Sequence, residues 1–172
     1  MFISDDTLSL RIAEPNDATL IYIWENDRSI WRVSDTSTPL SLFQIEQFLQ
    51  DNNNLASNHQ MRLMIVLNET QETIGTLDLF DYDSVHQRVS VGILIDPKHR
   101  NQGNGKHALQ LCIDYLFNNM MIHQIFATVD ELNEESIHVF KDLGFQNCGC
   151  RKEWIRTPQR YIDLFEFQLI KA

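Results

Sequence analysis

Residues 93–106 of the chain read ILIDPKHRNQGNGK. The apolar run ends at Ile95, a proline follows, and two of the chain's six glycines, Gly103 and Gly105, lie close together. An amphipathic helix is predicted from Asn104 to about Asn118, because apolar residues recur there at helical spacing. The segment is therefore predicted to form a strand, a glycine-containing loop and a helix in direct succession.

The loop between this strand and helix suits a diphosphate group. The first turn of a helix exposes N–H groups that have no intrahelical partner and carries the positive end of the helix dipole. Because Gly103 and Gly105 have no side chains, a pyrophosphate can approach these amides, and Arg100 and Lys106 add positive charge. The alternative is an ordinary glycine-containing turn that binds no ligand.

Two other phosphate-binding motifs do not match this loop. A Walker loop needs Ser or Thr after its lysine, whereas His107 follows Lys106. A dinucleotide-binding fingerprint would need a further glycine at His107 or Ala108. Residues 100–105 instead match the pattern Arg/Gln-x-x-Gly-x-Gly/Ala.

Hydrophobic patterning predicts the remaining elements. Strands are predicted at residues 8–12, 61–67, 73–80, 88–95, 125–129, 151–156 and 161–170. Asn16 or Asp17 is predicted to cap a helix that ends near Asn26, with Leu20, Ile23 and Trp24 on its inner face.

Two further helices are predicted from their caps. Ser41 and Gln44 form a capping-box pattern, and Asn133 caps a helix that ends at Leu143, before Gly144. The polar stretch 51–60 is expected to be a loop. The resulting order, βααβββαβαββ, predicts an α/β fold with a mixed sheet, helices on both faces, and a single domain over residues 1–172.

Composition and charge restrict the class of protein. The chain has 172 residues, of which 43% are hydrophobic and 22% charged, which excludes a disordered, collagen-like or coiled-coil protein. A net charge of −10 argues against a nucleic-acid partner and favours cations such as amines. Three cysteines form no disulfide framework, and we find no secretion signal and no membrane-spanning segment, so a cytoplasmic location is expected.

The combined pattern resembles the GCN5-related N-acetyltransferase (GNAT) superfamily, which binds acetyl-CoA through Arg/Gln-x-x-Gly-x-Gly/Ala after its fourth strand. Asn133-x-x-Ser136, followed by Phe140, resembles the CoA-contacting helix of that superfamily. Residues 85–88 and 133–138 are most similar to bacterial spermidine N-acetyltransferases and ribosomal-protein N-terminal acetyltransferases. The resemblance covers nearly the whole chain.

The resemblance implies a GNAT-like acyl-CoA N-acyltransferase fold, with acetyl-CoA as cosubstrate and no metal. The residues it implies for acetyl-CoA binding are Ile93, Leu94, Ile95, Arg100, Asn101, Gln102, Gly103, Asn104, Gly105, Lys106, Asn133, Ser136 and Phe140. A backbone N–H near Ile93–Ile95 is expected to bind the thioester oxygen.

The implied reaction moves the acetyl group directly from acetyl-CoA to a primary amine. Such an amine has a pKa of about 10.4, so a base is valuable. The superfamily's usual glutamate and tyrosine are here Ser90 and Phe140. The catalytic candidates are therefore Ser136, to hydrogen-bond the departing sulfur, and Asp78 and Asp81, which match acidic positions of the spermidine enzymes.

The nature of the acceptor stays open at this point. It is a polyamine-like small amine or a protein N-terminus, although residues 34–38 lack the glutamate pair of the spermidine enzymes, and Trp31 is a candidate wall of the acceptor pocket. The alternative function is a catalytically weak acyl-CoA-binding module of the same fold. A third hypothesis is a nucleotide-binding enzyme of another family, and a homo-oligomer is a further possibility.

Overall fold

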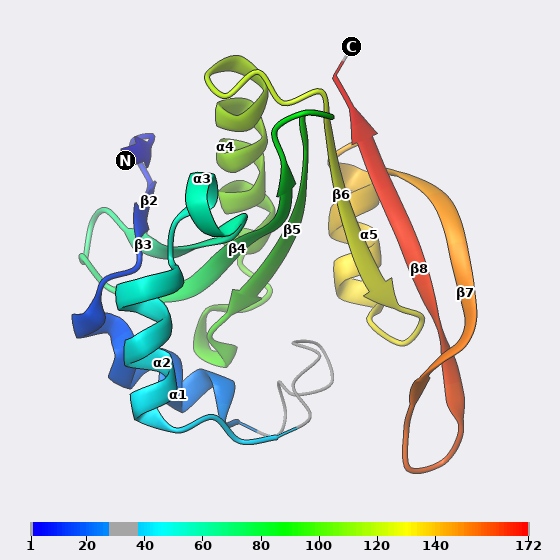
Figure 1. Ribbon diagram of the computed structural model, residues 1–172, viewed down its shortest axis with the longest axis horizontal. Helices are drawn as coiled ribbons and strands as arrows, with labels where there is room; N and C mark the ends of the chain where they lie inside the picture. Colours follow the sequence, from blue (N-terminus) through cyan, green and yellow to red (C-terminus); the bar gives the residue numbers. More distant parts are fainter. Residues whose placement is uncertain (1, 28–37, 172) are drawn as a thin grey trace.

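The computed structural model describes residues 2–27 and 38–171. Its centre is one eight-stranded mixed sheet in the order β1-β2-β3-β4-β5-β6-β8-β7, in which only the β5–β6 pair is parallel among the described strands (Figure 1). The strands are β1 (Phe2–Ser4), β2 (Leu8–Ile12), β3 (Met61–Leu67), β4 (Thr73–Asp83), β5 (Arg88–Ile95), β6 (Gln124–Asp130), β7 (Gln146–Arg156) and β8 (Tyr161–Ile170).

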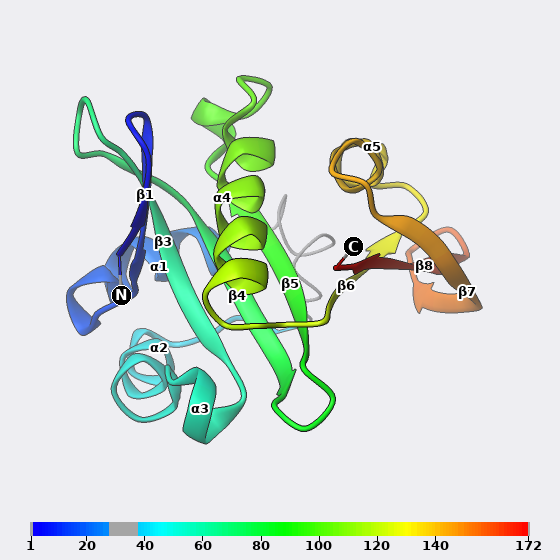
Figure 2. The same ribbon diagram turned by 90° about the horizontal axis from the view of Figure 1, so that it is seen from above.

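Helices lie on both faces of this sheet, as predicted (Figure 2). The helices are α1 (Ala18–Glu25), α2 (Leu42–Gln47), α3 (Leu55–Asn58), α4 (Asn104–Asn118) and α5 (Glu134–Asp142). Short turns of other helix types cover Pro15–Asp17, Phe48–Asn52 and Pro97–His99. No helix in the described part of the chain is long and apolar enough to cross a membrane.

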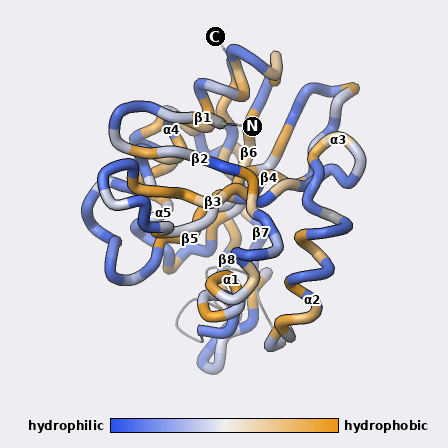
Figure 3. Tube along the Cα trace, turned by 90° about the vertical axis from the view of Figure 1, so that its left-hand side faces the viewer, coloured by the Kyte–Doolittle hydropathy of each residue, from blue (hydrophilic) through white to orange (hydrophobic). Residues whose placement is uncertain are grey.

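Side chains alternate between the two faces of the sheet along each strand, so the sheet separates two hydrophobic cores. On β3, Leu63 and Ile65 face the larger core with α4, whereas Met64 and Val66 face a smaller core with α1 and α2. Because both faces of β3 are buried, its sequence is almost continuously apolar. In Figure 3 the helix α2 carries both hydrophobic and hydrophilic segments, as a helix with one buried face does.

Several local predictions are confirmed. Ser41 and Gln44 form the predicted capping box, and the Asn133 side chain accepts a hydrogen bond from the Ser136 N–H group. Gly144 has a φ of 87°, the left-handed conformation expected just past a helix.

The prediction for the first helix is wrong in two respects. Ile23 is 59% exposed, because the inward face of α1 is formed by Ile21, Trp24 and Glu25. The Asp17 side chain does not cap α1 either. It accepts hydrogen bonds from the Arg11 guanidinium and from the Glu14 N–H group instead.

Two elements are absent from the prediction, and several strands are longer than predicted, among them β4, which continues to Asp83, and β7. β1 has only three residues, and α3 lies within the expected loop because the Asn54 side chain caps it. β7 begins at Gln146 rather than residue 151. Its first residues are exposed, so no apolar alternation marks them as a strand.

The parallel pair β5–β6 separates after three residues. Arg88–Ser90 pair with Gln124–Phe126, and beyond them β5 pairs only with β4 and β6 only with β8 among the described strands. Figure 1 shows the two strands diverging towards their carboxyl ends. Because the strands are parallel, the loop after β5 and the segment leading from β6 into α5 begin at the same edge of the sheet.

Candidate active site

Asp96 organises the turn that leads from β5 into the glycine-containing loop. Its Oδ1 accepts a hydrogen bond from the Lys98 N–H group at 2.9 Å, and its Oδ2 accepts one from Trp24 Nε1 at 3.0 Å. Its backbone N–H donates to the Ile74 carbonyl and its carbonyl accepts from His99 N–H, both at 2.8 Å. Burial raises the pKa of Asp96, but the hydrogen bonds outweigh it, so the pKa lies below its ordinary value.

The side chains of the loop fold back onto its carbonyl groups. Arg100 Nε donates a hydrogen bond to the Ile95 carbonyl at 3.0 Å. Gln102 Nε2 donates to the Lys98 carbonyl and Asn104 Nδ2 to the His99 carbonyl, both at 3.2 Å. These bonds occupy carbonyl oxygens and leave the backbone N–H groups of the loop available.

The backbone N–H groups of Arg100–Lys106 have no acceptor in the part of the chain that the structure describes. Gly103 lies at the start of α4 with a φ of 81°, and no atom lies within 4 Å of the position a Cβ would take. A Cβ on Gly105 would lie 3.4 Å from Ile95 Cγ1. Free donors at the positive end of a helix dipole are an arrangement that binds anions.

Two side-chain contacts connect the loop and the start of α4 to neighbouring elements. His99 Nε2 lies 3.1 Å from Glu72 Oε1, and Lys106 Nζ lies 2.9 Å from Asp142 Oδ2 on α5. The Lys106 side chain is therefore directed towards α5 in this structure. The predicted residues 93–95 and 100–106 thus lie on consecutive elements, from the end of β5 to the first turn of α4.

The predicted residues of α5 divide between its first turn and the core. Asn133 caps the helix, and the half-buried Ser136 hydroxyl has no hydrogen-bond partner among residues 2–27 and 38–171. Phe140 is 4% exposed, and its ring centroid lies 5.0 Å from that of Phe145 and 6.1 Å from that of Phe167. Phe140 is therefore a core residue in this structure, one turn beyond Ser136.

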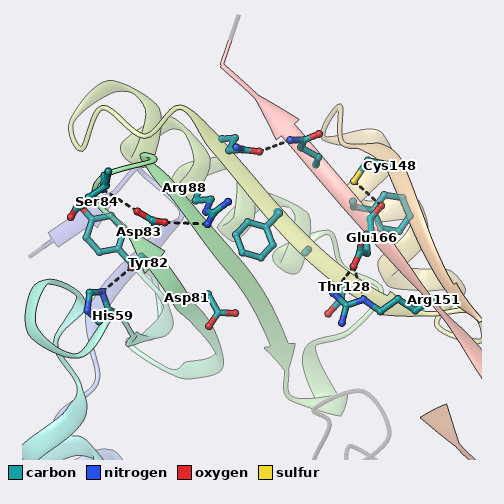
Figure 4. Close-up of a pocket in the computed structure, with 16 residues that line it drawn as sticks. His59, Asp81, Tyr82, Asp83, Ser84, Arg88, Thr128, Cys148, Arg151 and Glu166 are labelled. Carbon is teal, nitrogen blue, oxygen red and sulfur yellow. Dashed lines mark hydrogen bonds and ion pairs between the residues drawn. The ribbon is translucent and has the colours of Figure 1, made fainter. Parts of the chain in front are cut away.

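A hollow of about 720 Å³ lies on the sheet face opposite α4 and α5 (Figure 4). Its lining includes Arg88, Gln124 and Phe126, which all belong to the short stretch in which β5 and β6 pair, so the hollow lies over that stretch. Phe126 and Thr128 point into it, because Ile125 and Ala127, which alternate with them, are buried in the core on the other face.

Most charged groups that line the hollow are paired. Arg151 Nε lies 2.6 Å from Glu166 Oε1, and Arg88 lies 3.1 Å from Asp83 Oδ2. Asp81 lines the same hollow, is exposed and has no hydrogen-bond or ion-pair partner among the described residues. Its φ of 51° accompanies the irregularity in β4 between Phe80 and Asp83.

Asp78 has a different environment from Asp81. Its carboxylate accepts hydrogen bonds from Arg62 Nε at 2.6 Å and from a second Arg62 nitrogen at 3.0 Å, and Arg62 also lies 2.7 Å from Glu25. Burial lowers the pKa of Arg62, but the two carboxylates raise it further, so the net shift is upward. The structure does not bring Asp78 and Asp81 together, and Ser90 is only 1% exposed.

His59 lines the hollow and was not identified from the sequence. Its Nδ1 lies 2.8 Å from the Tyr82 carbonyl. A carbonyl only accepts, so Nδ1 carries the proton and Nε2 of the neutral ring is left as an acceptor. A single histidine in a polar stretch gives no signal that would have distinguished it.

A family model described as "Acetyltransferase (GNAT) domain" matches residues 7–146. The chain belongs to the GNAT acetyltransferase family. It is accordingly an enzyme that transfers an acetyl group from acetyl-CoA to an amine, as the sequence predicted. This match also confirms the predicted fold class.

Individual GNAT relatives cover nearly the whole chain. The uncharacterized N-acetyltransferase p20 of Bacillus licheniformis is 28% identical over 96% of this chain and 94% of its own. The spermidine N(1)-acetyltransferase of Vibrio cholerae is 24% identical, also over 96% and 94%. A crystal structure of the Vibrio cholerae spermidine enzyme with CoA and spermine has a TM-score of 0.87, 23% identity and 96% coverage of both chains.

Two sequence predictions lie outside the described residues. They concern Trp31 as a wall of the acceptor pocket and the missing glutamate pair in residues 34–38. The structure places neither of them relative to the hollow.

Proposed function

We propose that the acetyltransferase reaction takes place between the diverging ends of β5 and β6, with the coenzyme's diphosphate bound by the backbone N–H groups of Arg100–Lys106. The observation that carries this proposal is the row of free donors at the start of α4. The pantetheine arm would follow Ile93–Ile95, whose β6-facing edge has no strand partner in the described chain. Asn133 and Ser136 flank the same edge of the sheet.

The transfer itself is a direct displacement at the thioester. The amine nitrogen attacks the carbonyl carbon, the C–S bond breaks, and the coenzyme leaves as a thiolate while the amine loses a proton. A backbone N–H near Ile93–Ile95 would stabilise the negative oxygen that develops. The residues of the chain therefore need to hold one carbonyl oxygen, remove one proton and support one departing sulfur.

We assign the contact with the acceptor amine to Asp81 rather than to Asp78. Asp81 lines the hollow and has a carboxylate free of protein partners among the described residues, whereas the carboxylate of Asp78 is engaged by Arg62. A free carboxylate both attracts an ammonium group and accepts its proton. Asp78 then acts on the structure of the site rather than on the substrate.

Ser136 is assigned to the departing sulfur. Its hydroxyl is half-buried near the start of α5 and has no other partner in the described chain. Phe140, which carries no proton to donate, packs in the core behind it. The enzyme would therefore release a thiolate supported by one hydrogen bond rather than by a tyrosine.

The hollow favours a small cationic amine as acceptor over a protein N-terminus. In the described lining, the members of the Arg88–Asp83 and Arg151–Glu166 pairs neutralise each other, and the Asp81 carboxylate has no protein partner. The lining can therefore accept one additional positive charge at Asp81. The chain's net charge of −10 acts in the same direction. The Vibrio cholerae and Escherichia coli relatives are named as spermidine N(1)-acetyltransferases, which agrees with this choice.

The test is acetyl-CoA turnover with spermidine, a simple alkyl monoamine and a short peptide, with the acetylated product detected by mass spectrometry. Exposed Cys148 and Cys150 would disturb a thiol-release assay, so product mass is the better readout. We expect the fastest turnover with spermidine. Coenzyme binding without turnover would favour a catalytically weak acyl-CoA-binding module, and stabilisation by ATP or NAD instead of CoA would favour another family.

We also propose that residues 1–172 form one domain that assembles as a homo-oligomer in the cytoplasm. A single sheet contains both the first and last described strands, and the spermidine N-acetyltransferase of Vibrio cholerae forms a dodecamer. The three cysteines are unpaired, as expected in a reducing compartment. Light scattering on the purified chain tests the oligomeric state.

A further inference from the structure

Trp24 connects α1, which covers one face of the sheet, to the turn that follows β5. It belongs to α1, is 4% exposed, and packs in the smaller core with Ile21 and Met64. Its indole nitrogen nevertheless donates a hydrogen bond at 3.0 Å to Asp96, the residue that follows β5. A core tryptophan on the α1 side thereby contacts the first residue of the loop that leads to α4.

The Asp96 carboxylate has two donors with different functions. The Lys98 N–H group fixes Oδ1 and closes the turn Pro97–His99, which leads directly into Arg100. Trp24 fixes Oδ2. A carboxylate held at both oxygens cannot rotate, so the turn keeps one geometry.

The same hydrogen bond also matters electrostatically. Asp96 places a negative charge at the entrance of a loop whose free N–H groups suit an anion. The two N–H donors partly neutralise that charge. Without Trp24 the carboxylate would be less compensated and free to turn, and both changes oppose the binding of a diphosphate.

We propose that Trp24 is a positioning residue for the coenzyme: its indole N–H holds the Asp96 carboxylate in the orientation that keeps the amides of Arg100–Lys106 aligned for the diphosphate. This inference rests on the proposed function of that loop. It assigns to a buried residue of α1 a role in coenzyme affinity in addition to its packing.

The first experiment compares Trp24→Phe with Trp154→Phe. Phenylalanine keeps an aromatic ring at position 24 and removes only the N–H donor and part of the ring. The dissociation constant for CoA, measured by calorimetry, should rise about five- to tenfold in Trp24→Phe, with kcat at saturating acetyl-CoA nearly unchanged. Trp154 is 59% exposed on β7, and its replacement should change neither value.

A second substrate separates positioning of the loop from general loosening of the fold. S-acetylpantetheine carries the thioester but no diphosphate. Trp24→Phe should raise the KM for acetyl-CoA and leave the KM for S-acetylpantetheine unchanged. An equal rise for both substrates, or an unchanged affinity for CoA, overturns the proposal.

A third measurement leaves Trp24 in place and does not depend on how its variant folds. In Trp31→Phe/Trp154→Phe the Trp24 indole is the single tryptophan N–H signal in a ¹H–¹⁵N spectrum. We expect this signal to shift on addition of CoA and to stay in place with S-acetylpantetheine. If the signal does not shift on addition of CoA, the inference is contradicted. If the wild-type protein does not bind CoA, the proposed function is contradicted instead.

Discussion

Asp78 and Asp81 lie on the same strand, but their carboxylates differ in whether a described side chain pairs with them. Asp78 balances a buried arginine, and Asp81 faces a hollow with no protein partner among the described residues. The sequence alone assigned both to catalysis, because a pattern of acidic residues does not show which carboxylate is already neutralised. At the residue scale the distinction depends on the position of Arg62.

Replacing these two aspartates should have different effects. Asp81→Asn should lower kcat/KM for the amine about 100-fold with an unchanged dissociation constant for CoA, because it removes a base and not a coenzyme contact. Asp78→Asn, the matched control, should lower the free energy of unfolding by about 1–3 kcal/mol by leaving Arg62 partly uncompensated. Steady-state kinetics and urea unfolding of both variants test the assignment, and reversed effects would exchange the two roles.

Ser136→Ala should lower kcat by about tenfold, because the departing sulfur loses its hydrogen bond. The affinity for CoA should hardly change, since the hydroxyl makes no bond that supports the loop. Calorimetry with CoA and steady-state kinetics separate these effects. A kcat equal to that of the wild type would remove Ser136 from the mechanism.

The Arg11–Asp17 pair predicts how acid affects stability. Burial raises the pKa of Asp17, but hydrogen bonds from Arg11 and Glu14 outweigh it and hold the pKa below the ordinary 3.8. A carboxyl group with a lowered pKa contributes stability above its unfolded pKa, and this contribution is lost as the pH falls through the lower, folded value. Between about pH 5 and pH 2, Asp17→Asn should therefore lose less free energy of unfolding than the wild type. Identical losses in urea titrations would contradict this assignment.

At the scale of elements, β4 approaches β5 closely beside the edge at which we propose that the coenzyme binds. Gly75 pairs with Ile95, and a Cβ at Gly75 would lie 2.2 Å from the Leu94 carbonyl oxygen. The absence of a side chain there lets the two backbones approach next to Ile93–Ile95. The position of the last residues of β5, after which the loop begins, therefore depends on Gly75 in the neighbouring strand.

Gly75→Ala should destabilise the fold by about 1–3 kcal/mol, because backbone atoms of β5 have to move. It should also weaken CoA binding, since the displaced segment precedes the loop. Gly92→Ala is the matched control on β5, where a Cβ would lie 3.4 Å from the end of the Phe80 ring. Thermal unfolding with and without CoA measures both effects, and a Gly75→Ala protein with wild-type stability would contradict the close approach.

The elements that the sequence predicted well are those with a strong local signal. The capping box at Ser41, the cap at Asn133 and the amphipathic α4 follow from neighbouring residues, and the structure confirms them. The predicted β7 is too short because its first residues are exposed. In α1 the prediction is right for Trp24 and Leu20 and wrong for Ile23, because Ile21 and Glu25 are the other inward residues. Both errors arise where tertiary contacts, rather than local pattern, determine the boundary.

At the scale of the whole molecule, the proposed site depends on the separation of two parallel strands. The sequence predicts β5, the loop and α4 as consecutive elements, but the separation after Ser90 and Phe126 is a property of the assembled sheet. The hollow combines residues as distant in sequence as His59 and Glu166. Local patterns do not show such a combination, so the sequence could predict the strand, loop and helix at residues 93–118 but not the lining of the hollow.

The most direct test of the account is titration of the chain with CoA by calorimetry, for the wild type and for Gly105→Glu. The new side chain would start 3.4 Å from Ile95 Cγ1, between β5 and the first turn of α4, and its negative charge would repel the diphosphate. Gln110→Glu, which adds the same charge on an exposed position of α4, is the control. We expect binding by the wild type and by Gln110→Glu, and no detectable heat with a folded Gly105→Glu. Equal affinity in all three proteins, or no binding by the wild type, would contradict the assignment of Arg100–Lys106 to the coenzyme.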